Sequence, residues 1–237
     1  MFKLNQNMVS VELPVEWLNE AWGGRQEQEL PPVMTIGVSV VKVIIFPHGD
    51  KGMRVMKRYA VGNGTCTFKI SEAMRGFMRL LSDWQHVTIH IEDTDMSMTV
   101  QNCCSALQYK FPKIELCDDN AIPDHPKDIR VVVPCAQWLS MWKPMPAKGD
   151  IVISIDKTKR SMTMKHSKSR WAGAIQTHEK PNETQTFQCD SMIGKRMFAY
   201  VEPTSDFSNL VFMDCGVLKW TYDNVTIYLA PFVSESL

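Results

Sequence analysis

The chain has 237 residues, with 26 basic and 26 acidic side chains and a formal net charge of zero. This length can hold one large domain or two modest ones, each with a buried core. Balanced charge excludes a surface that attracts nucleic acid or an anionic membrane as a whole, so any such binding must come from a local patch. Residues 1–11 contain no apolar run like a signal peptide, and no later stretch reaches membrane-spanning length. We therefore expect an intracellular protein that does not act at a membrane.

The cysteines show no pattern typical of a metal site. Their number, seven, is odd, none of them forms a CxxC pair, and no histidine follows at zinc-finger spacing. We therefore expect buried, reduced thiols and no metal or other cofactor.

Two kinds of periodicity alternate along the chain. Apolar residues at i, i+3, i+4 and i+7 predict short, one-sided helices, and strict two-residue alternation predicts antiparallel strands. In chain order, these patterns give a helix at 15–22, a helix at 74–81, strands at 86–92 and 96–100, a helix at 135–142, strands at 150–156 and 162–164, and a looser helix at 189–200. A short polar turn separates the two strands of each pair, as in a β-hairpin.

The predicted elements repeat. The chain divides into four modules, each a strand, a helix and a run of strands, which start near Phe2, Cys66, Ile129 and Thr186. Residues 117–127, between the second and third modules, are rich in acidic residues and proline and lack either periodicity. We therefore predict an N-terminal domain at 1–116, an interdomain connecting segment at 117–127 and a C-terminal domain at 128–237.

The end of the chain carries the most specific motif. Residues 217–231, Val-Leu-Lys-Trp-Thr-Tyr-Asp-Asn-Val-Thr-Ile-Tyr-Leu-Ala-Pro, are followed by a short tail that contains Glu235. This segment resembles the closing strand pair of the DNA sliding clamps of the proliferating cell nuclear antigen family. Ala121, Ile122 and Pro123 are similar to the Gly-Ile-Pro of that family's interdomain connecting loop. The order of elements resembles the family over nearly the whole chain.

The resemblance implies an α+β fold. Each subunit would have two topologically similar clamp domains, each made of two β-α-β-β-β modules, with sheets outside and short helices lining a ring. Three subunits would close head to tail into a homotrimer, joined by the edge strands at 107–113 and 171–176, whose backbone groups would pair. The resemblance also implies work on DNA, in the nucleus or in another cellular or viral replication compartment.

A sliding ring needs cations that attract phosphates without contacting base edges. The resemblance places these cations on the lining helices. The DNA-contact candidates there are Arg75, Arg79, Lys143, Lys195 and Arg196. For each of them, an ordinary solvated helix face is an equal alternative. The first helix carries Glu16 and Glu20 and no basic residue, so we expect it to contribute little to DNA binding.

The second task of such a clamp is to recruit partners. In the family, a groove between the connecting loop and the last strand accepts a short partner motif. The matching positions here are Ala121, Ile122, Pro123, Leu229, Ala230 and Pro231. Core packing is the alternative for Ile122 and Leu229. The partners implied are a DNA polymerase, other proteins with short clamp-binding motifs, and a clamp loader.

Several functions compete. The leading hypothesis is a non-enzymatic sliding clamp that serves as a polymerase processivity factor. A non-encircling processivity factor of viral type and a subunit of a checkpoint clamp are nearer alternatives. A metal-dependent enzyme is an alternative of another class, because His90, Glu92 and Asp95 lie near one strand end and are residue types that bind metals.

Overall fold

The computed structural model describes residues 8–22, 28–47, 53–59, 65–118, 122–146, 148–179, 181, 183–190 and 203–230. The chain forms two compact units. One comprises Met1–Lys51 and Met56–Ala121, and the other comprises Gly52–Val55 and Ile122–Leu237. Most of the helix predicted at 189–200, with Lys195 and Arg196, lies outside the described residues, as does Phe2.

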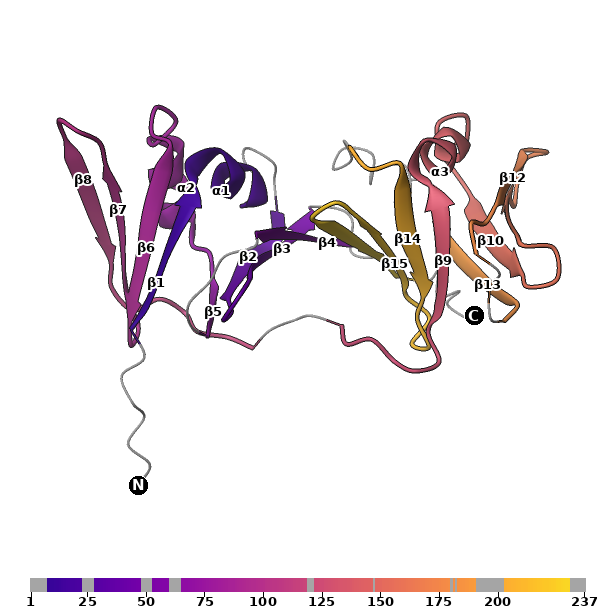
Figure 1. The fold of residues 1–237 in the computed structure, drawn as a ribbon, viewed down its shortest axis with the longest axis horizontal. Helices are drawn as coiled ribbons and strands as arrows, with labels where there is room; N and C mark the ends of the chain where they lie inside the picture. The colour runs from indigo at the N-terminus through magenta and orange to yellow at the C-terminus, as the bar shows by residue number, and fades with distance from the viewer. Residues whose placement is uncertain are drawn as a thin grey trace, which may run out of the picture. The chain divides into compact units, whose positions relative to one another are not determined.

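The first two modules have the same order of elements (Figure 1). The first consists of β1 (Val9–Pro14), α1 (Val15–Ala21), β2 (Gln28–Ile36), β3 (Val41–Pro47) and β4 (Met53–Tyr59). The second consists of β5 (Cys66–Lys69), α2 (Glu72–Arg79), β6 (His86–Glu92), β7 (Asp95–Gln101) and β8 (Ala106–Phe111). Each is therefore a β-α-β-β-β module, as the sequence predicted.

The two modules exchange their first strands. β1 pairs with β6 of the second module, with Val9 opposite Ile91, and gives the sheet order β1-β6-β7-β8. β5 in turn pairs with β2 of the first module, with Ile36 opposite Cys66, and gives the order β5-β2-β3-β4. Because neither sheet is complete without a strand of the other module, the two modules fold as one body.

The last two modules repeat this arrangement. The third consists of β9 (Ile129–Pro134), α3 (Cys135–Trp142), β10 (Asp150–Asp156), β11 (Ser161–His166) and β12 (Ala172–Gln176). The fourth has β13 (Gln185–Asp190), β14 (Phe207–Phe212), β15 (Leu218–Tyr222) and β16 (Val225–Leu229). The strand orders, β13-β10-β11-β12 and β9-β14-β15-β16, match those of the first unit strand for strand. The prediction of two topologically similar halves is thereby confirmed.

Alternating burial explains why the hairpin strands form. In β10, the side chains of Ile151, Ile153 and Ile155 are completely buried, while the residues between them are half-exposed. β6 shows the same alternation. A period of two places one row of apolar side chains on one face of a sheet, where burial of each contributes roughly 1.5–3 kcal/mol. Both strands have the bounds that the sequence predicted.

The helices are short, and two of them start directly after a proline that ends the preceding strand. Pro14 and Pro134 stand directly before α1 and α3 and hold an extended backbone there. α2 starts differently, because the Ser71 hydroxyl oxygen accepts a hydrogen bond of 3.3 Å from the Met74 amide. No helix among the described residues is long and apolar enough to cross a membrane.

Tryptophans fill the core of the second unit. Trp138 and Trp142 of α3 pack edge to face with ring centroids 5.3 Å apart, and Trp220 of β15 lies 6.1 Å from Trp138. All three side chains are fully buried. The predicted apolar stripe of this helix therefore faces the sheet that carries the C-terminal strand pair.

Candidate functional site

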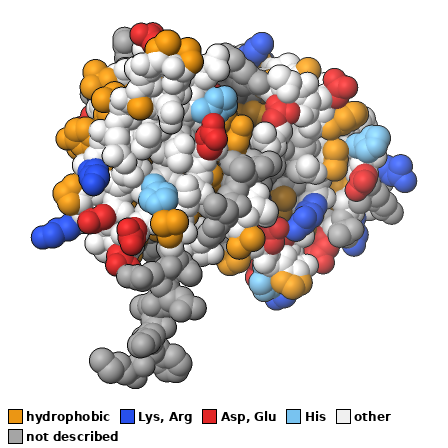
Figure 2. Space-filling view, turned by 60° about the vertical axis from the view of Figure 1, so that its left-hand side comes forward, with side chains coloured by type: hydrophobic (Ala, Val, Ile, Leu, Met, Phe, Trp, Pro, Cys, Tyr) orange, Lys and Arg blue, Asp and Glu red, His pale blue; other side chains and the backbone are white. Residues whose placement is uncertain are grey.

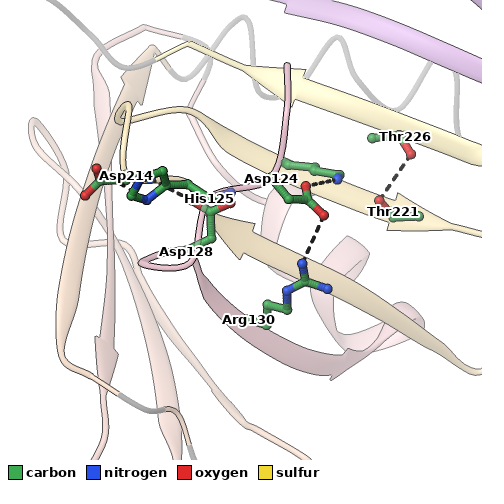
Figure 3. Close-up of polar contacts among 8 residues, drawn as sticks. Asp124, His125, Asp128, Arg130, Asp214, Thr221 and Thr226 are labelled. Atoms are coloured by element: carbon green, nitrogen blue, oxygen red, sulfur yellow. Dashed lines mark hydrogen bonds and ion pairs between the residues drawn. The ribbon is translucent and has the colours of Figure 1, made fainter. Parts of the chain in front are cut away.

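The later part of the connecting segment, from Asp124 onward, is fixed to the second unit by an ion-pair cluster (Figure 3). One oxygen of the Asp124 carboxylate accepts a hydrogen bond of 2.6 Å from the Lys219 ammonium of β15. The other oxygen accepts one of 2.9 Å from the Arg130 guanidinium of β9. A single carboxylate thus ties the segment to two strands of one sheet.

The electrostatics of Asp124 agree with this geometry. The hydrogen bond from Lys219 is the main cause that holds the pKa of the Asp124 carboxyl below its ordinary value, and Arg130 adds to the effect. The Lys219 side chain is only 13% exposed. Its Nζ lies 6.0 Å from the centroid of the Tyr228 ring, and Tyr228 is its register partner on β16. Lys219 therefore connects the segment to the strand pair that ends the described chain.

A second carboxylate fixes the far end of the segment. The buried Asp128 accepts a hydrogen bond of 2.7 Å from the His125 amide and another of 2.9 Å from the Asp214 amide. The His125 imidazole also lies 3.7 Å from the Asp214 carboxylate (Figure 3). Residues 124–128 are therefore held at both ends against the second unit.

The predicted partner-binding residues fall into three groups. Pro123 and Ala230 are exposed and Ile122 is half-buried, so all three can offer surface to a ligand. Leu229 is fully buried opposite Leu218, and so belongs to the core beneath that surface. Ala121 and Pro231 lie outside the described residues.

The turn between β14 and β15 depends on glycine. Gly216 has φ 85°, a conformation that other residues seldom adopt. Its amide donates a hydrogen bond of 2.8 Å to the Met213 carbonyl, and the Met213 amide donates one of 2.9 Å to the Val217 carbonyl. Gly216 and Val217 therefore close the hairpin that carries Lys219.

The predicted DNA-contact residues differ in accessibility. Arg79 is 46% exposed but Arg75 only 12%, and each donates a hydrogen bond of 3.1 Å to the same carboxylate, that of Glu72. Lys143, directly after α3, is exposed, whereas Lys195 and Arg196 lie outside the described residues. Acidic and basic side chains are interspersed on the face in Figure 2. Glu72, which sequence reasoning missed, thus offsets part of the positive charge of α2.

The metal hypothesis finds no site. Among the described residues, no group of three or more His, Cys, Asp or Glu side chains is placed to hold a metal ion. His90 and Glu92 stand two positions apart on β6, roughly 6.6 Å along the strand. Asp95 pairs with Glu92 across the hairpin, while Ser97 stands opposite His90. The alternative hypothesis of a metal-dependent enzyme around His90, Glu92 and Asp95 therefore gains no support from the described residues.

Two edge strands occupy the positions where the sequence predicted contacts between subunits. β8 and β12 are each the terminal strand of a four-stranded sheet. On β8, Leu107 is 42% and Tyr109 49% exposed. Next to β8 lies a cleft of about 490 Å³, lined by Lys69 at the end of β5, by the start of α2 and by Tyr109 and Phe111.

The duplicated modules give the chain a fold like that of DNA sliding clamps. It superposes on the DNA polymerase III beta subunit of Thermotoga maritima with a TM-score of 0.65, over 98% of this chain and 67% of that one. A putative DNA polymerase III beta subunit of Eubacterium rectale gives 0.66 over the same shares. Identity is 10% in both cases, and no family model or curated protein matches the sequence. The similarity shows the fold, and confirms the clamp-like fold predicted from the sequence.

Proposed function

We propose that the chain is a subunit of a DNA sliding clamp that encircles duplex DNA and acts as a processivity factor for a DNA polymerase, without catalysis of its own. The observation that carries this proposal is the pair of units with the same exchanged-strand topology, combined with the similarity to DNA polymerase III beta subunits. Its place of action is wherever DNA is replicated.

Binding of DNA would be independent of sequence. Arg79 and Lys143 are exposed cations at or just after short helices, and Lys195 and Arg196 are further candidates from the sequence. Such side chains bind phosphates and give an affinity that falls with salt. The chain has no net charge, and the pairing of Arg75 and Arg79 with Glu72 weakens their attraction for phosphates. Both features favour encirclement of DNA over binding by charge alone.

Partner recruitment would use the surface around the connecting segment. Ile122, Pro123 and Ala230 supply accessible apolar groups, with Ala121 and Pro231 as further candidates from the sequence. The bonds of Asp124 to Lys219 and Arg130 would restrict the positions of Ile122 and Pro123, which directly precede it. A surface fixed in advance binds a short motif at a smaller cost in conformational entropy. A polymerase, other proteins with clamp-binding motifs and a clamp loader are the proposed partners.

Closure of the ring would use the two edge strands. β8 of one subunit would pair with β12 of the next, so that each satisfies the backbone groups of the other. Head-to-tail contacts close into a ring when the rotation from one subunit to the next is a whole fraction of 360°. By the family resemblance, three copies would close the ring.

Two measurements test the proposal. Native mass spectrometry at micromolar concentration should give the mass of three chains. The protein should also stay on nicked circular DNA and leave linear DNA of the same length through its ends. A monomer that leaves both DNAs equally fast, with steep salt dependence, would instead identify a non-encircling processivity factor. Assembly only with two different chains would identify a checkpoint clamp subunit.

A further inference from the structure

The turn between β7 and β8 presents two adjacent thiols. Cys103 and Cys104 are both exposed, and their sulfur atoms lie 3.3 Å apart. Cys215 is exposed as well. The expectation that the cysteines are buried is therefore wrong for these three, because each lies in a polar turn and not in an apolar stripe.

Asn102 fixes the shape of this turn. Its side-chain oxygen accepts hydrogen bonds from the Cys104 amide at 2.9 Å, from the Ser105 amide at 2.8 Å and from the Ser105 hydroxyl at 3.0 Å. The Asn102 amide donates to the Ser105 carbonyl at 2.9 Å. An asparagine that caps its own turn in this way limits the backbone conformations available to the two cysteines. The folded chain thus holds both sulfurs together.

We propose that Cys103 and Cys104 form a reversible dithiol–disulfide site that exchanges with low-molecular-weight disulfides such as oxidised glutathione. One thiol loses its proton to solvent, and its thiolate attacks a sulfur of the small disulfide, which forms a mixed disulfide and releases one glutathione thiolate. The second cysteine, as a thiolate, then attacks the protein sulfur of the mixed disulfide and releases the second glutathione thiolate. Two protein thiols are oxidised and one small disulfide is reduced to two thiols.

The chemistry of adjacent cysteines makes this bond easy to reverse. Neighbouring Cα atoms are about 3.8 Å apart, below the usual 4.4–6.8 Å of disulfides. A ring closed over one peptide bond is therefore strained, and strained or exposed disulfides are the labile ones. Thiols in an excess of reduced glutathione should reopen it.

The other cysteines of the chain provide internal references. Cys215 is exposed and has no adjacent cysteine in the sequence, so it serves as the reference for a single accessible thiol. Cys66 and Cys117 are half-buried, and Cys135 and Cys189 are buried. Ring closure is therefore expected at 103–104 while Cys215 accumulates the mixed disulfide.

Peptide mapping tests the proposal on the native, full-length protein. After oxidised glutathione and alkylation, trypsin releases residues 80–110, which contain only these two cysteines. We expect this peptide to be lighter than its dithiol form by two hydrogen atoms and to carry no alkyl group. Treatment with dithiothreitol should restore its two thiols. In Cys103→Ser and Cys104→Ser, the remaining cysteine should carry a stable glutathione adduct. Two adducts, or two free thiols, on the native peptide once Cys215 is fully modified would overturn the proposal.

A further variant tests the role of the turn. Asn102→Ala removes the shared acceptor and should lower the ratio of ring closure to mixed disulfide severalfold, with no change in modification of Cys215. An unchanged ratio would overturn the claim that the folded turn holds the sulfurs together. Phenylarsine oxide, which bridges two nearby thiols, should protect this pair from alkylation in the native protein and in neither serine variant. Equal protection in the serine variants would count against a paired site.

Discussion

The carboxylate of Asp124 and the ammonium group of Lys219 lie 2.6 Å apart, although 95 residues separate them in the sequence. The contact joins the connecting segment to β15, whose neighbour β16 carries Tyr228 and Leu229. One ion pair thus links the connecting segment to the strand pair beside which the proposed partner surface lies. The position of the segment therefore depends on charged and polar contacts.

Asp124→Asn should loosen the connecting segment. The change removes the negative charge and leaves the nearly buried Lys219 ammonium with a weaker acceptor. Because the Asp124 side chain is 43% exposed, solvent screening limits the cost to about 1 kcal/mol. Hydrogen exchange at residues 122–128 should speed up severalfold, and affinity for a short clamp-binding peptide should fall. Asp118→Asn, at an exposed linker carboxylate, is the matched control, and equal exchange in both variants would contradict the role of Asp124.

Acid should release the same contact. The pKa of the folded Asp124 carboxyl lies below its ordinary value of 3.8, chiefly because Lys219 donates to it. A lowered folded pKa means that the ion pair contributes its full stability above the ordinary pKa and loses it as the pH falls through the folded one. Exchange at 122–128, corrected for its intrinsic pH dependence, should stay constant from neutral pH to about 5 and rise below about 4. Asp124→Asn should lack this step, and a step of the same size in that variant would assign it to another group.

Glu72→Gln should strengthen DNA binding. Glu72 accepts a hydrogen bond from Arg75 and another from Arg79, so its carboxylate competes with phosphates for both guanidinium groups. Its removal should steepen the dependence of log affinity on log salt by about one to two units, since each added phosphate contact contributes about 0.9. Fluorescence anisotropy with a short duplex at several salt concentrations measures this slope. Glu92→Gln, at an exposed strand end, should leave it unchanged. An unchanged slope in Glu72→Gln would remove α2 from the proposed DNA surface.

The sequence predicted those features of the fold that depend on residues close together in the chain, such as the bounds of strands. The alternation around Ile89 and Ile153 fixed the bounds of β6 and β10, because burial on a strand repeats every second residue. The contact between Asp124 and Lys219 depends on strand pairing across 95 positions, for which no local pattern exists. Glu72 could have been recognised from its positions three and seven residues before Arg75 and Arg79. The sequence could not decide whether Leu229 is buried in the core or exposed to a partner, because an apolar residue in a terminal strand is compatible with both.

Leu107→Lys should prevent assembly while the fold of the subunit stays intact. Leu107 is 42% exposed on the edge strand β8, so the new ammonium group can remain in water in the isolated subunit. In a strand-to-strand contact it would lose that hydration, which is how edge lysines block association. Native mass spectrometry should show mainly single chains, and retention on circular DNA should be lost. The thermal unfolding midpoint of the monomer should move little.

The control is Leu80→Lys, because Leu80 is exposed at the end of α2 and lies on no sheet edge. This variant carries the same added charge and should assemble like the unchanged chain. If both variants assemble normally, β8 is not the edge that joins subunits. If both fail, added charge alone disturbs assembly and the edge has no special part. Only a difference between the two ties the exposed edge of β8 to ring closure.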